Sequence, residues 1–91
     1  MKSIIKKPWG SYQVLDIEKQ YLVKKIIVNS GQKLSLQSHK YRSEHWIIAD
    51  GEAEVTLDDK IFFLKKNEKI FIPKKVKHRL ANNYKKKLII I

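Results

Sequence analysis

Ninety-one residues with a formal net charge of +11 leave room for one domain, spanning residues 1–91, and one hydrophobic core. The chain contains no cysteine, which excludes disulfides and thiolate ligands, so a metal would need nitrogen and oxygen ligands. Its apolar runs are too short for a signal peptide or a membrane-spanning helix, and we expect a cytoplasmic protein with no membrane partner.

Short strand-like segments alternate with turn residues along the chain, and no helical apolar period lasts for three turns. The pattern predicts an all-β domain, either a sandwich or a small barrel such as a jelly roll. Asn29 to Gly31, Asp50-Gly51 and Leu57 to Lys60 are expected turns, because their residues suit tight loops or tolerate positive φ. The expected strands lie near residues 11–16, 20–28, 33–39, 44–50, 52–58, 61–65, 69–72, 78–82 and 87–91.

The basic residues are almost all lysine. Of the 20 Lys and Arg residues only Arg42 and Arg79 are arginine, and the lysines stand in scattered pairs and triplets. Proteins that read nucleic-acid bases commonly use arginine and interleave aromatic residues with it. A nucleic-acid-associated basic domain therefore fits poorly, and we expect no nucleic-acid partner, although the charge could still steer anionic ligands to the protein.

Two of the three histidines lie in the stretch LSLQSHKYRSEHW. Strand alternation places Gln37 and His39 on one face, and Glu44 can join them if KYRS is the bend between two paired strands. His78, at the start of a later strand, could complete the group. Such a mixed nitrogen and oxygen set suits Zn²⁺, Fe²⁺, Mn²⁺ or Ni²⁺ with an open position for substrate. By spacing alone, these residues fit the polar face of a strand equally well.

The segments GQKLSLQSHKYRSEHWIIADG and NEKIFIPKKVKHRLAN resemble the two-part signature of the cupins. The first part is matched by Gly31, Gln37 at the first histidine position, His39, Glu44 and Gly51. The second part is matched by Pro73, His78 and Asn82, whereas Asn67 and Lys75 stand at glycine positions. The resemblance implies a single-domain cupin, a jelly-roll barrel also described as a double-stranded β-helix.

Together with KPWGSYQVLD and GEAEVTLDDK, these segments resemble the C-terminal domain of type II phosphomannose isomerases. These are the bifunctional mannose-1-phosphate guanylyltransferases/mannose-6-phosphate isomerases, and glutamine at the first histidine position is a feature of phosphomannose isomerases. The resemblance implies metal-dependent interconversion of mannose 6-phosphate and fructose 6-phosphate, in the supply of precursors for GDP-mannose and polysaccharides. It also implies a sugar-phosphate partner and a homodimer.

The same resemblance assigns roles to residues. Gln37, His39, Glu44 and His78 are the expected ligands of a divalent metal, with zinc first and Mn, Fe, Ni or Co as alternatives. Arg42 is expected to contact phosphate or the reacting oxygens, because its planar fork suits oxyanions. Lys40 and Lys33 are further candidates for the phosphate. His45 is a candidate catalytic base, although simple alternation points it away from Glu44.

The chain departs from the family pattern at several places. It lacks the guanylyltransferase domain that usually precedes this cupin, and family members continue beyond its last residues, so we expect a shortened C-terminal end. Lys75 either adopts positive φ or reshapes the turn before His78. These departures leave a second hypothesis open. It is a non-catalytic domain that binds a sugar phosphate or nucleotide sugar and works with a separate guanylyltransferase.

Overall fold

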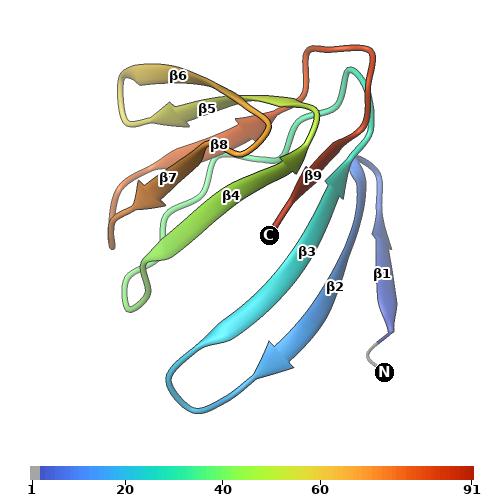
Figure 1. Ribbon diagram of the computed structural model, residues 1–91. Coiled ribbons are helices and arrows are strands. Elements are labelled where there is room, and N and C mark those ends of the chain that lie inside the picture. Colours follow the sequence, from blue (N-terminus) through green and yellow to red (C-terminus); the bar gives the residue numbers. More distant parts are fainter. Residues whose placement is uncertain (1–2) are drawn as a thin grey trace.

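The computed structural model describes residues 3–91, and within them the chain forms strands and connecting loops without a helix (Figure 1). No helix that could cross a membrane occurs in this part of the chain. The all-β prediction is confirmed. The strands are β1 (Ile4–Lys7), β2 (Gly10–Ile17), β3 (Leu22–Val28), β4 (Glu44–Asp50), β5 (Glu52–Leu57), β6 (Lys60–Lys65), β7 (Lys69–Ile72), β8 (His78–Ala81) and β9 (Leu88–Ile90).

The strands form two sheets whose inner faces enclose the core. The larger sheet has the order β1-β2-β3-β9-β4-β7, and the smaller sheet has the order β6-β5-β8 (Figure 1). Apolar side chains from both sheets meet between them and are at most 6% exposed: Val28, Trp46, Ile48, Ala53, Val55, Ile72, Leu80, Leu88 and Ile90. Alternation explains this set, since Trp46 and Ile48 of β4 point inward whereas Ile47 between them is exposed.

The segment expected as a strand at 33–39 is not one. It makes two isolated bridges to the outer edge of β8, from Lys33 to Ala81 and from Gln37 to His78. Leu36 between the bridges is 48% exposed. The segment leaves β8 after Gln37 because the chain must cross to the other sheet to begin β4. The expectation that 33–39 and β4 pair with each other is therefore wrong, although a bend does occur in KYRS.

The first strand, β1, was missed from the sequence. It pairs with β2 through a turn at Pro8 and Trp9, with Lys7 opposite Gly10. A Cβ on Gly10 would lie 2.0 Å from the carbonyl oxygen of Ile27, so glycine is required for this turn to pack against β3. The turn thereby holds Lys7 and Trp9 close to β3.

Lys75 adopts φ +69°, so the first of its two expected conformations is confirmed. Its backbone N–H donates to the carbonyl oxygen of His39 at 2.7 Å, which ties the turn before His78 to the loop that carries His39. Asn67, at the other glycine position of the signature, also has positive φ, at +75°. The signature's glycines therefore correspond to a backbone conformation that this chain keeps without glycine.

Replacing Lys75 by glycine should stabilise the protein. The left-handed conformation costs a residue with a Cβ about 1–2 kcal/mol, and glycine removes this cost. Glycine also makes the unfolded chain more flexible, which cancels about half of the stabilisation. We expect the free energy of unfolding in urea to rise by about 0.5–1 kcal/mol. Lys74→Gly, one position earlier and outside the positive-φ region, is the matched control and should lower it. An equal loss of stability in both variants would contradict the expectation.

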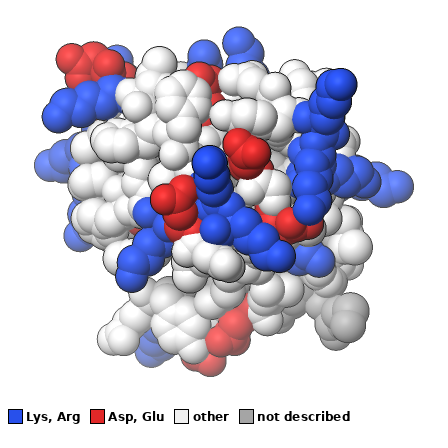
Figure 2. Space-filling view, turned by 45° about the horizontal axis from the view of Figure 1, so that its top comes forward, with Lys and Arg blue, Asp and Glu red and all other residues white. Residues whose placement is uncertain are grey.

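Charged side chains of both signs lie on the face drawn in Figure 2. Lys and Arg side chains project there at several separate places with Asp and Glu between them. Lys86, for example, contacts Asp50 at 2.8 Å, and this pairing lowers the pKa of Asp50. On this face the basic residues form no single block.

Candidate metal centre

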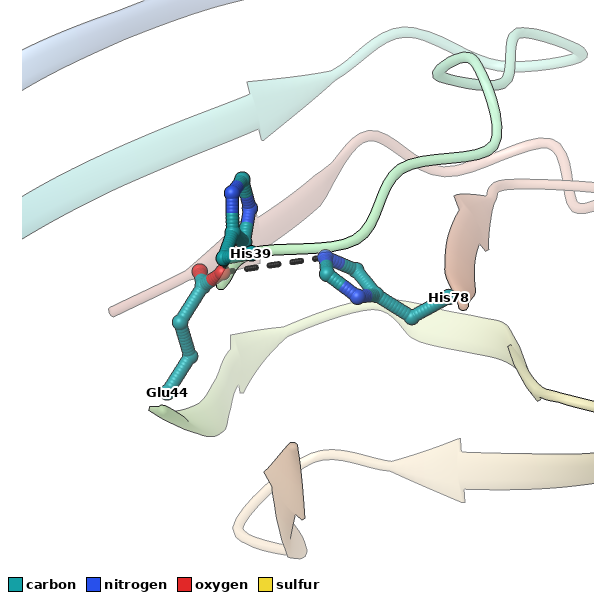
Figure 3. A group of neighbouring side chains, drawn as sticks. All are labelled: His39, Glu44 and His78. Carbon is teal, nitrogen blue, oxygen red and sulfur yellow. Dashed lines mark ion pairs between the residues drawn. The ribbon is translucent and has the colours of Figure 1, made fainter. Parts of the chain in front are cut away.

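His39, Glu44 and His78 point toward one another from three parts of the chain (Figure 3). Glu44 is the first residue of β4, His78 is the first residue of β8, and His39 lies in the loop between the 33–37 segment and β4. Because β4 and β8 belong to different sheets, the three side chains meet across the barrel and not along one hairpin. Their ligand atoms all lie within 4.8 Å of one another.

The hydrogen bonds fix the tautomer of His78. Its Nδ1 lies 3.1 Å from the carbonyl oxygen of Val76, which can only accept, so Nδ1 carries the proton of the neutral ring. Nε2 therefore presents a lone pair, and it faces Glu44 Oε2 at 3.6 Å. This distance is too long for a hydrogen bond, and both atoms are acceptors.

Nε2 of His39 lies beside the same carboxylate oxygen and also acts as an acceptor. This nitrogen lies 3.0 Å from Arg42 Nη2 and 3.1 Å from Glu44 Oε2. Since a guanidinium only donates, the neutral imidazole accepts from Arg42 and has no proton for Glu44. Partial burial, followed by the charge of Arg42, lowers the pKa of His39; Glu44 opposes the shift, and Lys24 contributes to it. The ring is therefore held in the neutral form that metal binding needs.

The result is an arrangement of acceptors with too few donors. Glu44 Oε2 is buried and accepts no hydrogen bond from any residue in the range 3–91. A buried carboxylate oxygen without a donor is costly, and the two imidazole nitrogens beside it cannot supply one. A divalent cation among these three atoms would satisfy all of them, and two imidazoles with a carboxylate are a donor set that such ions accept. The residues therefore fit a metal.

Trp46 holds two members of the group in place. Its indole Nε1 donates to Glu44 Oε1 at 3.1 Å, which leaves Oε2 turned toward the imidazoles. Its ring also packs edge-on against His78, with centroids 5.6 Å apart. Trp46 is 6% exposed and belongs to the core. Such outer contacts orient metal ligands and tune their affinity.

Gln37 is placed beside His78 by two backbone hydrogen bonds of 2.9 and 2.7 Å. Gln37 and the three ligand candidates line one pocket of about 330 Å³, a size that holds a small molecule. The structure thus groups His39, Glu44 and His78, and Gln37 and Arg42 line the same pocket.

The other predicted site residues lie elsewhere. His45 is exposed and packs against Phe71, with centroids 4.8 Å apart, on the face of β4 opposite to Glu44. Lys33 and Lys40 are exposed and are not among the residues that line the pocket. The geometry therefore does not bring the expected base or these two phosphate candidates to the metal ligands.

Two lysines that the sequence analysis did not select line the pocket instead. Lys24 lies on β3 between Leu22 and Ile26, on the face that turns toward the pocket, and Lys7 ends β1. The signal for Lys24 was present, because a lysine in the same alternation phase as Ile26 and Val28 has to point inward. Lys7 carried no such signal, since its position depends on the packing of the following turn.

The family model for the mannose-6-phosphate isomerase C-terminal domain matches residues 1–91. The chain belongs to this family. The alginate biosynthesis protein AlgA of Pseudomonas aeruginosa is 49% identical over 85 residues, covering 93% of this chain and 18% of that protein. A mannose-1-phosphate guanylyltransferase of Salmonella montevideo is 43% identical over 76 residues, covering 84% of this chain and 16% of its own length. The chain thus spans less than a fifth of these relatives.

Solved structures confirm the fold. An RmlC-like cupin from Shewanella frigidimarina superposes with a TM-score of 0.86 at 23% identity, covering 99% of this chain and 81% of that one. The capsular polysaccharide assembling protein CapF of Staphylococcus aureus superposes with a TM-score of 0.89 at 16% identity, covering 99% of this chain and 27% of that one. At these identities the likeness shows the cupin barrel alone, which confirms the predicted fold class.

Proposed function

We propose that this family member is a metal-dependent aldose–ketose isomerase that interconverts mannose 6-phosphate and fructose 6-phosphate. The observation that carries the proposal is the buried Glu44 oxygen without a donor, which faces Nε2 of His39 and Nε2 of His78 at one side of a sugar-sized pocket. Family membership supports the choice of substrate.

The reaction moves one proton from C2 to C1 and one from the C2 hydroxyl to the C1 oxygen, so it needs no oxidant or reductant. A divalent metal held by Gln37, His39, Glu44 and His78 would supply Lewis acidity toward the two sugar oxygens. Arg42, beside His39, is placed to stabilise negative charge that develops on those oxygens when the carbon-bound proton leaves.

A second function is favoured by the position of His45. Because its side chain turns away from the pocket, the expected base is missing from the site. The alternative is a non-catalytic domain that binds a sugar phosphate or a nucleotide sugar beside a separate guanylyltransferase. The homodimer that the resemblance implies stays a prediction.

Removal of the metal distinguishes the two functions. We expect protein loaded with Zn, Mn, Fe, Ni or Co to convert mannose 6-phosphate to fructose 6-phosphate, detected by coupling to phosphoglucose isomerase and glucose-6-phosphate dehydrogenase. Dialysis against a chelator should abolish the rate, and one of these metals should restore it. A rate that chelation leaves unchanged would contradict the metal-dependent reaction. Sugar-phosphate binding without conversion under every loading condition would favour the binding domain.

A further inference from the structure

Positive charge gathers inside the pocket. Its lining carries four side chains that are cationic at neutral pH, Lys7, Lys24, Arg42 and Arg79, whereas Glu44 is the one carboxylate among the lining residues. A divalent metal at the ligand group would add further positive charge. A concave site with such an excess attracts anions, because its low-dielectric walls focus the field.

Lys24 and Lys7 bring their charge from the β1–β3 side of the pocket. Lys24 is half-buried, and its ammonium lies 4.8 Å from the centroid of the Tyr12 ring. None of the ion pairs within residues 3–91 involves either lysine. Partial burial of an ammonium without a carboxylate partner is unfavourable, and a bound anion would offset this cost.

Arg42 comes from the loop before β4 and lies beside the ligand group. Its guanidinium contacts His39 Nε2 at 3.0 Å and lies 3.8 Å from Glu44 Oε2, so it accompanies the metal ligands. A hexose 6-phosphate also has two distinct ends, because C1 and C2 react at one end and C6 carries the phosphate at the other. A site for this substrate needs a cationic group away from the metal, and the lysines are the candidates on the β1–β3 side.

We propose that Lys24, assisted by Lys7, binds the phosphate group of a phosphorylated sugar, while Arg42 stays at the reacting end. The identity of the sugar rests on the proposed function, whereas the phosphate site itself does not. Lys24 and Lys7 replace Lys33 and Lys40, which lie outside the pocket, as the phosphate-binding residues.

The test measures binding separately from turnover. Lys24→Met and Lys7→Met remove the charge and keep most of the stem, and Lys25→Met is the matched control because Lys25 is the neighbouring residue on β3 and does not line the pocket. Each protein is titrated by calorimetry with mannose 6-phosphate, inorganic phosphate and mannose, with and without metal. Circular dichroism checks folding, and Lys24→Arg keeps the charge if the methionine variant fails to fold.

We expect the Kd for mannose 6-phosphate to rise about 10- to 100-fold in Lys24→Met, as loss of a charged hydrogen bond usually causes. Lys7→Met should show a smaller rise. Mannose binding and the Lys25→Met control should stay within about twofold. Lys24→Arg should retain most of the affinity, and added salt should weaken phosphate binding in the wild type more than in Lys24→Met.

The outcomes separate this proposal from the isomerase itself. If Lys24→Met binds mannose 6-phosphate and inorganic phosphate as the wild type does, the phosphate site is wrong even in an active enzyme. If binding depends on Lys24 and no fructose 6-phosphate forms, the result supports the phosphate site and contradicts the proposed isomerase activity. A further titration with GDP-mannose tests which ligand carries the phosphate. If GDP-mannose binds more tightly than mannose 6-phosphate and its binding depends on Lys24, the result supports the site and assigns it to a nucleotide sugar.

Discussion

Glu44→Gln should abolish metal binding and leave the fold intact. The substitution keeps the shape of the side chain, and the amide oxygen can still accept from Trp46 Nε1 as Glu44 Oε1 does at 3.1 Å. The amide nitrogen then takes the place of Oε2, where it can donate to the lone pairs of His39 and His78 and cannot bind a cation. Changes to outer contacts alone weaken metal affinity about 10- to 100-fold, so we expect a loss of at least about 100-fold here.

Metal content and thermal stability measure this effect together. With metal at about 100 times its Kd, the wild type should gain about 2.7 kcal/mol of stability, whereas Glu44→Gln should gain almost none. Without metal the variant should melt no lower than the wild type, because the orphaned oxygen has been replaced by a donor. Isomerase activity should fall with metal content.

Glu52→Gln is the control for loss of one carboxylate, because Glu52 begins β5 and does not line the pocket. His45→Ala is the corresponding control for metal content among the histidines, since His45 packs against Phe71 on the outer face. A Glu44→Gln protein that still retains one metal per chain would refute the assignment of the ligand group.

The grouping of His39, Glu44 and His78 could be predicted from the sequence although part of the local structure could not. The spacing of Gln37, His39, Glu44 and His78 left a polar strand face equally open. The resemblance to the two-part signature selected these residues, because a signature records which residues meet in the folded barrel. The predicted strand pairing was wrong. Residues 33–39 were expected to pair with β4, whereas Gln37 pairs with His78 of the other sheet. Alternation within a short segment gives the facing of a side chain and says nothing about which strand lies beside it.

The other pocket residues were harder to predict from the sequence, because alternation does not show which strands are neighbours. Lys33 and Lys40 are close to the ligands in sequence, but their backbone positions turn them outward, and both are exposed. Lys24 and Lys7 come from strands remote in sequence and reach the pocket through the order β1-β2-β3 of the large sheet. For His45, alternation along β4 already indicated the outward direction that the structure confirms.

Asn82→Ala should be strongly destabilising although Asn82 is outside the candidate metal centre. The Asn82 side chain is 0% exposed and makes three hydrogen bonds to the backbone. Its Nδ2 donates to the carbonyl oxygens of Val28 at 3.0 Å and Lys86 at 2.9 Å, and its Oδ1 accepts from the N–H of Tyr84 at 3.0 Å. These bonds fasten the loop between β8 and β9 to the end of β3.

Truncation to alanine leaves these backbone groups without their partner, at about 1–3 kcal/mol for each buried group. We expect a loss of about 3–6 kcal/mol in urea unfolding and a melting temperature lower by at least about 12 °C. Domains of this kind have about 5–15 kcal/mol in total, so the variant should be partly unfolded at 37 °C. Asn83→Ala is the matched control, since Asn83 is exposed and its side-chain amide donates to the Glu54 carboxylate at 2.8 Å. That control should change stability by about 0.5 kcal/mol or less. Equal losses in the two variants would contradict the structural role of Asn82, because Asn82, unlike Asn83, bonds both to the end of β3 and to the loop that leads into β9.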